Sequence, residues 1–331
     1  MEVLDTSFGS KHKVMGSAGH SMKELRILNR TVKWTDAGMT IEADAKHVKV
    51  LIEKMGMENA KQVTTLAVRV EGARNSKDVK DDEDDVAAVD ESKVKGKNEE
   101  EDEDLDSEGG YRYRSWTARL NYLNIDRSDI QFAVKQCAKN MSKPKQSDLV
   151  KLKRIVRHVK FRQTMVTNLL WQESCPVLKA FTDSDWAGDR VNRKSTSGGA
   201  LVLGGHTLKT WGKDQSVIAM SSGEAELYAA NYGGAQALGI KIMAKELGIE
   251  ISIEIHIDAK AAMGIINRQG LGKVRHIEVQ DLWLQNAVKE KRLKLSKVPS
   301  EENVADLMTK PLPPETIKYH LRGLKMEWKC A

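Results

Sequence analysis

Five carboxylates in the C-terminal half of the 331-residue chain stand at the ends of predicted elements or on a helix face. They are Asp183 and Asp185 after one strand, Glu226 inside a long helix, Asp258 at the end of a later strand, and Asp306 at the start of the last helix. Hard divalent cations prefer oxygen ligands, and carboxylates from separate elements can supply them. Two such ions ~3.5–4 Å apart can hold both the attacking water and the leaving oxygen of a phosphodiester. The pattern predicts a hydrolytic site with two cations, although each acid alone is more typical of a charged surface.

The long predicted helix contains two glutamates, and their helical positions separate their roles. Ser221 and Glu224 fit a capping box, in which each side chain accepts a hydrogen bond from the other residue's backbone N–H. Glu226 lies about 200° around the helix from Glu224, at about 100° per residue. Its own face continues to the small residues Ala229 and Gly233, which allow a strand to approach closely. We therefore expect Glu226 to be the metal ligand, and we leave Asp183 and Asp185 as alternatives for another ligand.

The elements that position these acids form an α/β pattern from Cys175 onward. Its order is three strands, a helix, a strand, two helices, a strand and a short helix. The predicted strands are 177–181, 197–203, 207–211, 251–257 and 293–298, and the predicted helices are 221–247, 259–267, 277–289 and 304–309.

The region before this unit is predicted to be largely helical. Apolar spacing indicates helices at 128–137 and 147–160. The second helix carries a basic face of Lys151, Lys153, Arg154 and Arg157. This face could follow a nucleic-acid backbone, and a merely solvated face is almost as good an interpretation. Further upstream, residues 32–34 and 39–41 indicate strands, and residues up to Met57 indicate a helix.

Charge is distributed unevenly along the chain. The net charge is +6, but residues 78–108 hold sixteen acidic residues and four lysines, so the rest carries +18. Self-repulsion and the lack of aromatic residues predict a disordered acidic linker at 77–110. A basic remainder suits a polyanionic partner such as nucleic acid, although a lysine-rich soluble surface has the same composition.

Membrane and disulfide signals are weak. No run approaches the roughly 18 apolar residues of a membrane helix, and the N-terminus lacks a signal pattern. The three cysteines, Cys137, Cys175 and Cys330, have neither metal-ligand nor disulfide spacing. We therefore expect an intracellular protein with no membrane partner.

Six motifs then occur in a fixed order over some 130 residues. They are Phe181-Thr-Asp-Ser-Asp-Trp-Ala-Gly188, Arg193-Lys-Ser-Thr-Ser-Gly198, Met220-Ser-Ser-Gly-Glu-Ala-Glu-Leu-Tyr228, Ile255-His-Ile-Asp-Ala259, Arg275-His-Ile-Glu278 and Asn303-Val-Ala-Asp-Leu-Met-Thr-Lys-Pro311. This set resembles the ribonuclease H domain of copia-type retrotransposon Pol polyproteins.

The resemblance implies a ribonuclease H-like mixed five-stranded sheet flanked by helices. It also implies hydrolysis of the RNA strand of an RNA–DNA hybrid with two Mg²⁺ ions, or with Mn²⁺. The family's catalytic and metal-binding acids fall on Asp183, Glu226, Asp258 and Asp306. We add Arg193, Lys194 and Ser195 to the basic helix as candidate nucleic-acid-binding residues. For such a polyprotein, the expected locations are a cytoplasmic virus-like particle or the nucleus.

The sequence departs from the family pattern in three places. Cellular ribonucleases H carry a histidine just before the fourth carboxylate, and residues 298–303 contain none. His276 belongs to another predicted helix, where a helix-end or core position is the simpler interpretation. Gly223 and Leu227 replace the usual threonine and tyrosine, and neither change affects a predicted ligand.

The preceding residues resemble the end of a reverse transcriptase. The match is closest at 117–133 and 141–144 and weaker at 32–57. Polymerases of this family use paired aspartates in a Tyr-Val-Asp-Asp motif, which the chain lacks. We therefore expect no polymerase activity from it.

The resulting organisation has five parts. They are a reverse-transcriptase remnant at 1–76, the acidic linker at 77–110, a helical connection segment at 111–174, a ribonuclease H domain at 175–314 and a tail at 315–331. Two other functions stay open. One is a catalytically silent, nucleic-acid-binding remnant of a decayed element, and the other is a host interaction protein that uses its acidic segment.

Overall fold

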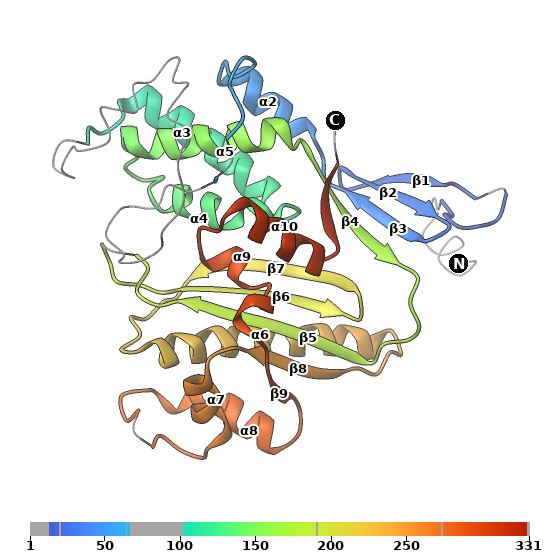
Figure 1. The fold of residues 1–331 in the computed structure, drawn as a ribbon, viewed down its shortest axis with the longest axis vertical. Helices are drawn as coiled ribbons and strands as arrows, with labels where there is room; N and C mark the ends of the chain where they lie inside the picture. The colour runs from blue at the N-terminus through green and yellow to red at the C-terminus, as the bar shows by residue number, and fades with distance from the viewer. Residues whose placement is uncertain are drawn as a thin grey trace, which may run out of the picture.

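Two five-stranded sheets organise the chain in the computed structural model (Figure 1). The structure describes residues 13–19, 21–63, 65–66, 102–189, 191–272 and 274–329. Most of the predicted acidic linker therefore lies outside the described residues. Within the described ranges, no helix is both long enough and apolar enough to cross a membrane.

The sheet built from the C-terminal half is mixed. Its strands are β5 (Val177–Asp185), β6 (Thr196–Leu203), β7 (His206–Asp214), β8 (Ser252–Ile257) and β9 (Lys294–Lys297), and their order across the sheet is β7-β6-β5-β8-β9. β5, β6 and β7 are antiparallel neighbours, whereas β8 runs parallel to β5 and β9 runs parallel to β8. This arrangement confirms the predicted ribonuclease H-like sheet.

Helices cover both faces of the mixed sheet (Figure 1). They are α6 (Ser222–Glu246), α7 (Lys260–Asn267) and α8 (Trp283–Lys289) on one side and α9 (Asp306–Thr309) on the other. Because side chains alternate along a strand, β6 contributes to two cores. Leu201 packs in the core with Leu227 of α6, while Ala200 and Val202 pack in the core that contains Met308 of α9.

The second sheet is antiparallel and combines distant parts of the chain. Its strands in spatial order are β1 (Glu24–Ile27), β2 (Arg30–Thr35), β3 (Gly38–Glu42), β4 (Thr164–Leu170) and β10 (Met326–Lys329). Sequence analysis predicted β2 and β3 but not β1, β4 or β10. Residues 315–331, expected to be a tail, contribute most of α10 (Pro314–Gly323) and all of β10.

The remaining helices pack against one another, and α4 also contacts β7 of the mixed sheet (Figure 1). They are α2 (Lys46–Lys54), α3 (Ser107–Leu123), α4 (Gln131–Lys139) and α5 (Gln146–Phe161). α3 begins earlier than the predicted end of the acidic linker, because the Asp106 side chain caps it by accepting a 2.7 Å hydrogen bond from Gly109 N. An N-cap carboxylate satisfies backbone donors that a helix end otherwise leaves unpaired.

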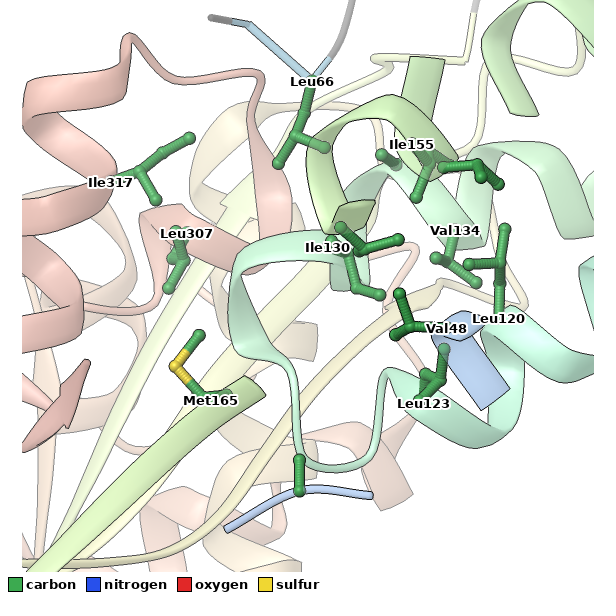
Figure 2. Packing of buried hydrophobic residues seen from close by; sticks show 14 of the residues in the cluster. Val48, Leu66, Leu120, Leu123, Ile130, Val134, Ile155, Met165, Leu307 and Ile317 are labelled. Atoms are coloured by element: carbon green, nitrogen blue, oxygen red, sulfur yellow. The ribbon is translucent and has the colours of Figure 1, made fainter. Parts of the chain in front are cut away.

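One hydrophobic core joins these helices to the mixed sheet (Figure 2). Val48 of α2, Leu120 of α3 and Ile155 of α5 belong to the same buried cluster as Leu307 of α9 and Ile317 of α10. The helix that carries Asp306 is therefore held from outside the mixed sheet as well as by it.

A buried ionic cluster fixes the C-terminal strand to the helices. Arg127 donates to Asp129 at 2.8 Å and 2.7 Å, and both side chains are almost fully buried. His158 lies 2.9 Å from the same carboxylate, and Trp328 of β10 donates to it at 2.9 Å. Burial alone raises the pKa of Asp129, but the Arg127 charge and its hydrogen bonds outweigh that effect and hold the pKa well below its usual range.

Replacing Arg127 with methionine should strongly destabilise the protein, because it leaves the Asp129 charge buried without its main partner. The expected loss is about 3–5 kcal/mol in the free energy of unfolding, measured by urea denaturation. Arg112→Met is the control, since Arg112 pairs with Glu108 at the exposed surface and such pairs contribute less than about 1 kcal/mol. Equal losses in the two variants would contradict a structural role for the cluster.

Candidate metal centre

Three carboxylates meet at one edge of the mixed sheet. One oxygen from each of Asp183, Glu226 and Asp258 lies within 4.8 Å of the others. Asp183 is near the end of β5 and Asp258 directly follows β8. These two strands are parallel, with Phe181 opposite His256, so their carboxyl ends reach the same edge. The structure thus brings together three of the four acids predicted as ligands.

Close helix packing brings Glu226 to the other two. A Cβ atom added to Gly233 would lie 2.4 Å from Thr182 Cγ2, so only glycine allows α6 to approach β5 this closely. Two turns earlier in the helix, Glu226 Oε1 accepts hydrogen bonds from Ser184 N at 3.1 Å and from Ser184 Oγ at 3.0 Å. The small-residue face predicted from sequence is the face that contacts the strand.

Glu224 has a structural role at the helix N-terminus, although its backbone partner is Met220 and not the N-cap Ser221 that the capping box predicts. Its carboxylate accepts from Met220 N at 2.9 Å and from Tyr228 OH at 3.2 Å. His276 Nε2 lies 2.8 Å from the same carboxylate. His276 is in a turn and its side chain is partly exposed, so it is neither a core residue nor within the predicted helix. The structure places it against Glu224.

Asp306 joins the centre through a lysine. Lys310 Nζ lies 3.2 Å from Asp183 Oδ1 and 2.9 Å from Asp306 Oδ1. Thr309 Oγ1 donates a hydrogen bond to Asp183 Oδ2. Sequence reasoning missed Thr309 and Lys310, although residues three and four positions after Asp306 share its helix face.

Close packing also holds α9 against the sheet. A Cβ atom on Gly198 of β6 would lie 2.5 Å from Thr309 Cγ2, and one on Gly212 of β7 would lie 2.7 Å from Met308 O. These two glycines let the short helix approach near enough for Thr309 to reach Asp183.

Asp185, the alternative to Asp183, lies beside the centre. It is half-buried, whereas Asp183 is 1% exposed. It does not belong to the group of converging carboxylates found among the described residues. The geometry therefore favours Asp183 as the ligand.

Burial and mutual repulsion make the carboxylates difficult to ionise. Burial raises the pKa of Glu226 to about 8, and the charges of Asp183 and Asp258 contribute to the increase. Burial raises the pKa of Asp183 too, and Asp306 adds to that effect. A bound cation would favour the ionised forms instead.

The donor set fits a divalent cation. Three carboxylate oxygens from separate elements are the ligands that Mg²⁺ and Mn²⁺ prefer. Glu226 Oε2 is buried and has no hydrogen-bond partner among the described residues. A buried carboxylate oxygen without a partner is costly unless a cation neutralises it.

Some side chains of the basic helix predicted to bind nucleic acid already contact other parts of the chain. On α5, Arg154 Nε donates to Thr65 O at 2.8 Å and Arg157 Nε donates to Lys61 O at 2.9 Å. Lys151 pairs with Asp148 at 3.0 Å and stays half-exposed, and Lys153 is also partly exposed. The two arginines therefore hold Lys61 and Thr65, while the lysines keep more contact with solvent.

The second candidate group for nucleic-acid binding lies in the loop between β5 and β6. Arg193 is exposed and Lys194 is partly exposed. Ser195 is fully buried, and its hydroxyl accepts a 3.1 Å hydrogen bond from Ala187 N. This contact gives Ser195 a role in shaping the loop.

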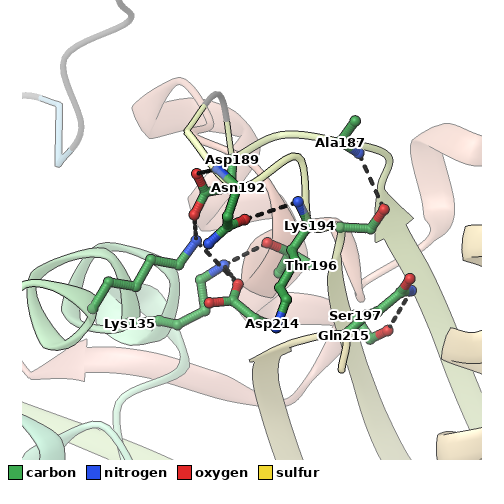
Figure 3. Close-up of polar contacts among 11 residues, drawn as sticks. Lys135, Ala187, Asp189, Asn192, Lys194, Thr196, Ser197, Asp214 and Gln215 are labelled. Carbon is green, nitrogen blue, oxygen red and sulfur yellow. Dashed lines mark hydrogen bonds and ion pairs between the residues drawn. The ribbon is translucent and has the colours of Figure 1, made fainter. Parts of the chain in front are cut away.

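Lysines of α4 hold the same loop from the helical region (Figure 3). Lys135 Nζ lies 2.9 Å from Asp214 of β7, and Lys139 Nζ lies 2.9 Å from Asp189 in the loop. The helical region thus contributes to the shape of the surface beside the carboxylates.

Curated relatives of the chain include retrotransposon Pol polyproteins. The chain is 31% identical over 204 residues to the retrovirus-related Pol polyprotein from transposon TNT 1-94 of Nicotiana tabacum, and 30% identical over 203 residues to that from transposon RE1 of Arabidopsis thaliana. It is also 30% identical over 131 residues to secreted RxLR effector protein 161 of Plasmopara viticola, and covers 92% of that protein. The chain is related to the copia-type retrotransposon Pol polyproteins. The matches include about 60% of this chain but only 15% and 14% of the two Pol polyproteins.

Other comparisons add less. No protein-family model matches the chain. Two solved structures align with 44% of it, each with a TM-score of 0.28. They are the N-terminal RNase H domain of rv2228c from Mycobacterium tuberculosis, at 13% identity and 96% coverage, and LC11-RNase H1 in complex with an RNA/DNA hybrid, at 18% identity and 99% coverage. These TM-scores are too low to support a fold assignment, which depends on the strand order of the mixed sheet.

Replacing Glu226 with glutamine should stabilise the protein in alkaline buffer that contains a chelator. A folded-state pKa of about 8 exceeds the ordinary value of 4.5, so the stability that this group contributes is complete below pH 4.5 and is lost as the pH rises through 8. The glutamine side chain does not ionise, so the variant lacks this loss. Above that pH its free energy of unfolding should exceed that of the wild type by at least about 1 kcal/mol, since one pKa unit corresponds to about 1.4 kcal/mol.

Urea denaturation at several pH values measures this difference, with Glu246→Gln at the exposed end of the same helix as the control. Adding Mg²⁺ should stabilise the wild type more than Glu226→Gln, because a cation that binds only the folded state shifts the equilibrium toward it. Identical pH profiles for the wild type and Glu226→Gln would show that Glu226 is not under this electrostatic strain.

Proposed function

We propose that this chain hydrolyses the RNA strand of RNA–DNA hybrids, using two divalent cations, Mg²⁺ or Mn²⁺, held by Asp183, Glu226, Asp258 and Asp306. The convergence of three carboxylates from β5, α6 and the end of β8 is the observation that carries the proposal. The relation to the Pol polyproteins supports it, since these polyproteins belong to retrotransposons. Polymerase activity is not part of the proposal, because the chain lacks the paired-aspartate motif.

Each residue near the centre has a part in this chemistry. When bound, the cations activate a water molecule and stabilise negative charge on the phosphodiester. Asp183, Glu226 and Asp258 would hold them, with Asp306 as a further ligand. Ser184 fixes the orientation of Glu226 through two hydrogen bonds, and Thr309 fixes that of Asp183. Ligands held in this way need little rearrangement when the cations bind.

The RNA–DNA hybrid is the proposed partner, and basic residues on two elements would bind it. Lys151, Lys153, Arg154 and Arg157 lie on α5, and Arg193 and Lys194 lie in the loop between β5 and β6. Cations of this kind neutralise backbone phosphates without reading sequence. The preference for a hybrid over duplex DNA would come from contacts to the 2′-hydroxyl groups of the RNA strand.

We also propose the division into a reverse-transcriptase remnant, an acidic linker, a connection segment and a ribonuclease H domain. The shared core between α2–α5 and α9 means that the last two parts pack together. Activity assays therefore use the full chain.

The Asp258→Asn variant should lose hybrid cleavage while keeping hybrid binding. The change removes a metal ligand but leaves the basic surface intact. Loss of a residue that only orients a metal ligand already costs about 10–100-fold, so we expect more than about 100-fold here. Gel assays of a labelled hybrid and of duplex DNA, with Mg²⁺ or with a chelator, measure it.

Asp36→Asn, at an exposed turn between β2 and β3, is the matched control and should cut like the wild type. Equal cutting by the wild type and Asp258→Asn would reveal a contaminating nuclease and reject the proposal. Binding without cutting by the wild type would support the silent-remnant alternative.

Replacing Lys151 and Lys153 with glutamine should flatten the salt dependence of hybrid binding. Each phosphate contact contributes roughly 0.7–0.9 to the slope of log affinity against log salt, so we expect the slope to fall by about one to two units. Titrations at several salt concentrations, in the Asp258→Asn background to prevent cleavage, measure the slope. Lys318→Gln with Lys325→Gln is the control pair, and an unchanged slope in the α5 variant would exclude these lysines from the interface.

A further inference from the structure

We infer that the Lys310 ammonium group occupies the place of one of the two cations until a phosphodiester binds. In the absence of nucleic acid the centre would then take up one divalent ion, and the second would enter only as Lys310 moves away from Asp183 and Asp306. The inference rests on the proposed function, because it concerns the same carboxylates.

The position of Lys310 between two proposed ligands carries the inference. Its Nζ atom lies 3.2 Å from Asp183 and 2.9 Å from Asp306. Glu226 and Asp258 each offer an oxygen within 4.8 Å of one on Asp183. Among the described residues, Lys310 forms its ion pairs with Asp183 and Asp306 and not with these two. A cation bridging Asp183 and Asp306 would need the space that the ammonium group fills, whereas a cation among Asp183, Glu226 and Asp258 would not.

Charge balance favours the same order of binding. Four ionised carboxylates are neutralised by two divalent ions, so with Lys310 still in place the centre would carry an extra positive charge. A phosphodiester supplies one negative charge, so the centre returns to neutrality when the displaced Lys310 ammonium group moves from the carboxylates toward the phosphate. Before it arrives, one divalent ion together with Lys310 leaves a residual charge of only minus one, and a second ion would meet the repulsion of the ammonium group at close range.

The lysine side chain can make the required movement. It is 36% exposed, so the protein does not enclose it. A lysine has a flexible four-carbon stem, and its charge is not restricted to one planar geometry. Asp185 lies close enough for the Lys310 charge to act on it, and offers a second acceptor on the same side of the sheet. The ammonium group can therefore leave Asp183 without becoming unpaired, and can also approach the incoming phosphate.

The number of Mn²⁺ ions bound per chain tests the inference without any cleavage step. Titration calorimetry and electron paramagnetic resonance on the full chain, without nucleic acid, should give one ion for the wild type. Lys310→Met keeps most of the length of the side chain but removes its charge. It should bind two ions, or bind the second at least about tenfold more tightly, because the nearby positive charge is gone. Lys310→Arg keeps the charge and should behave like the wild type.

Three further samples make the result specific. Lys318→Met removes a lysine that pairs with Glu315 on the surface of α10 and should still bind one ion. Asp306→Asn combined with Lys310→Met should lose the second ion, since it removes the remaining ligand. A hybrid with 2′-O-methyl RNA, which resists cleavage, should raise the wild-type count from one ion to two. Lys310→Gln provides a second neutral variant if the methionine variant does not fold.

The outcomes separate this inference from the proposed function. If the wild type binds ions and cuts hybrids, but Lys310→Met and Lys310→Gln leave the number and affinity of the ions unchanged, the role of Lys310 is rejected and the proposed function stands. Two ions on the wild type without nucleic acid would reject it as well. If no variant binds Mn²⁺ at all, both the role of Lys310 and the proposed function are contradicted.

Discussion

Mutual repulsion among Asp183, Glu226 and Asp258 is the physical constraint around which this part of the molecule is built. Carboxylates whose oxygens lie within 4.8 Å repel one another strongly in a partly buried site. The fold opposes that repulsion with rigid connections. β5 and β8 are joined by parallel pairing, and the contact between Gly233 and Thr182 holds α6 against β5. The carboxylate cluster by itself therefore lowers the stability of the folded protein, and a bound cation raises it again. A loss of stability at a functional site is common in proteins.

The rest of the chain supports this centre from the opposite face of the sheet. α9 contributes Asp306, Thr309 and Lys310, yet it is a single turn and could not hold its position alone. Leu307 and Met308 belong to the core that includes α2, α3 and α5, and β10 returns after α10 to pair with β4. Residues predicted as separate domains thus share one core and one sheet. This sharing explains why the C-terminal residues form a strand of the antiparallel sheet.

Local patterns carried the predictions that succeeded. Hydrophobic periodicity located the strands of the mixed sheet and the long helix, and the helical phase distinguished Glu226 from Glu224. The predicted N-cap at Ser221 is present in the structure, where Ser221 Oγ accepts from Glu224 N at 3.2 Å. These features depend on neighbours within a few residues, so a sequence displays them directly.

Features that depend on distant contacts were not predictable in this way. β4 and β10 pair across about 160 residues, so their pairing has no local signature in the sequence. The choice between Asp183 and Asp185 depended on burial, and the role of Lys310 depended on the approach of α9 to β5. The basic face of α5 was correctly assigned to a helix, but its arginines bind Lys61 and Thr65, which no local signal indicated.

The central claim is that these carboxylates bind two cations, and anomalous scattering from Mn²⁺ tests it most directly. A crystal of the full chain with an uncleavable hybrid and Mn²⁺ should show two anomalous peaks, about 3.5–4 Å apart, in contact with Asp183, Glu226, Asp258 and Asp306. Anomalous peaks located elsewhere, or none beside the carboxylates at saturating Mn²⁺, would contradict the account.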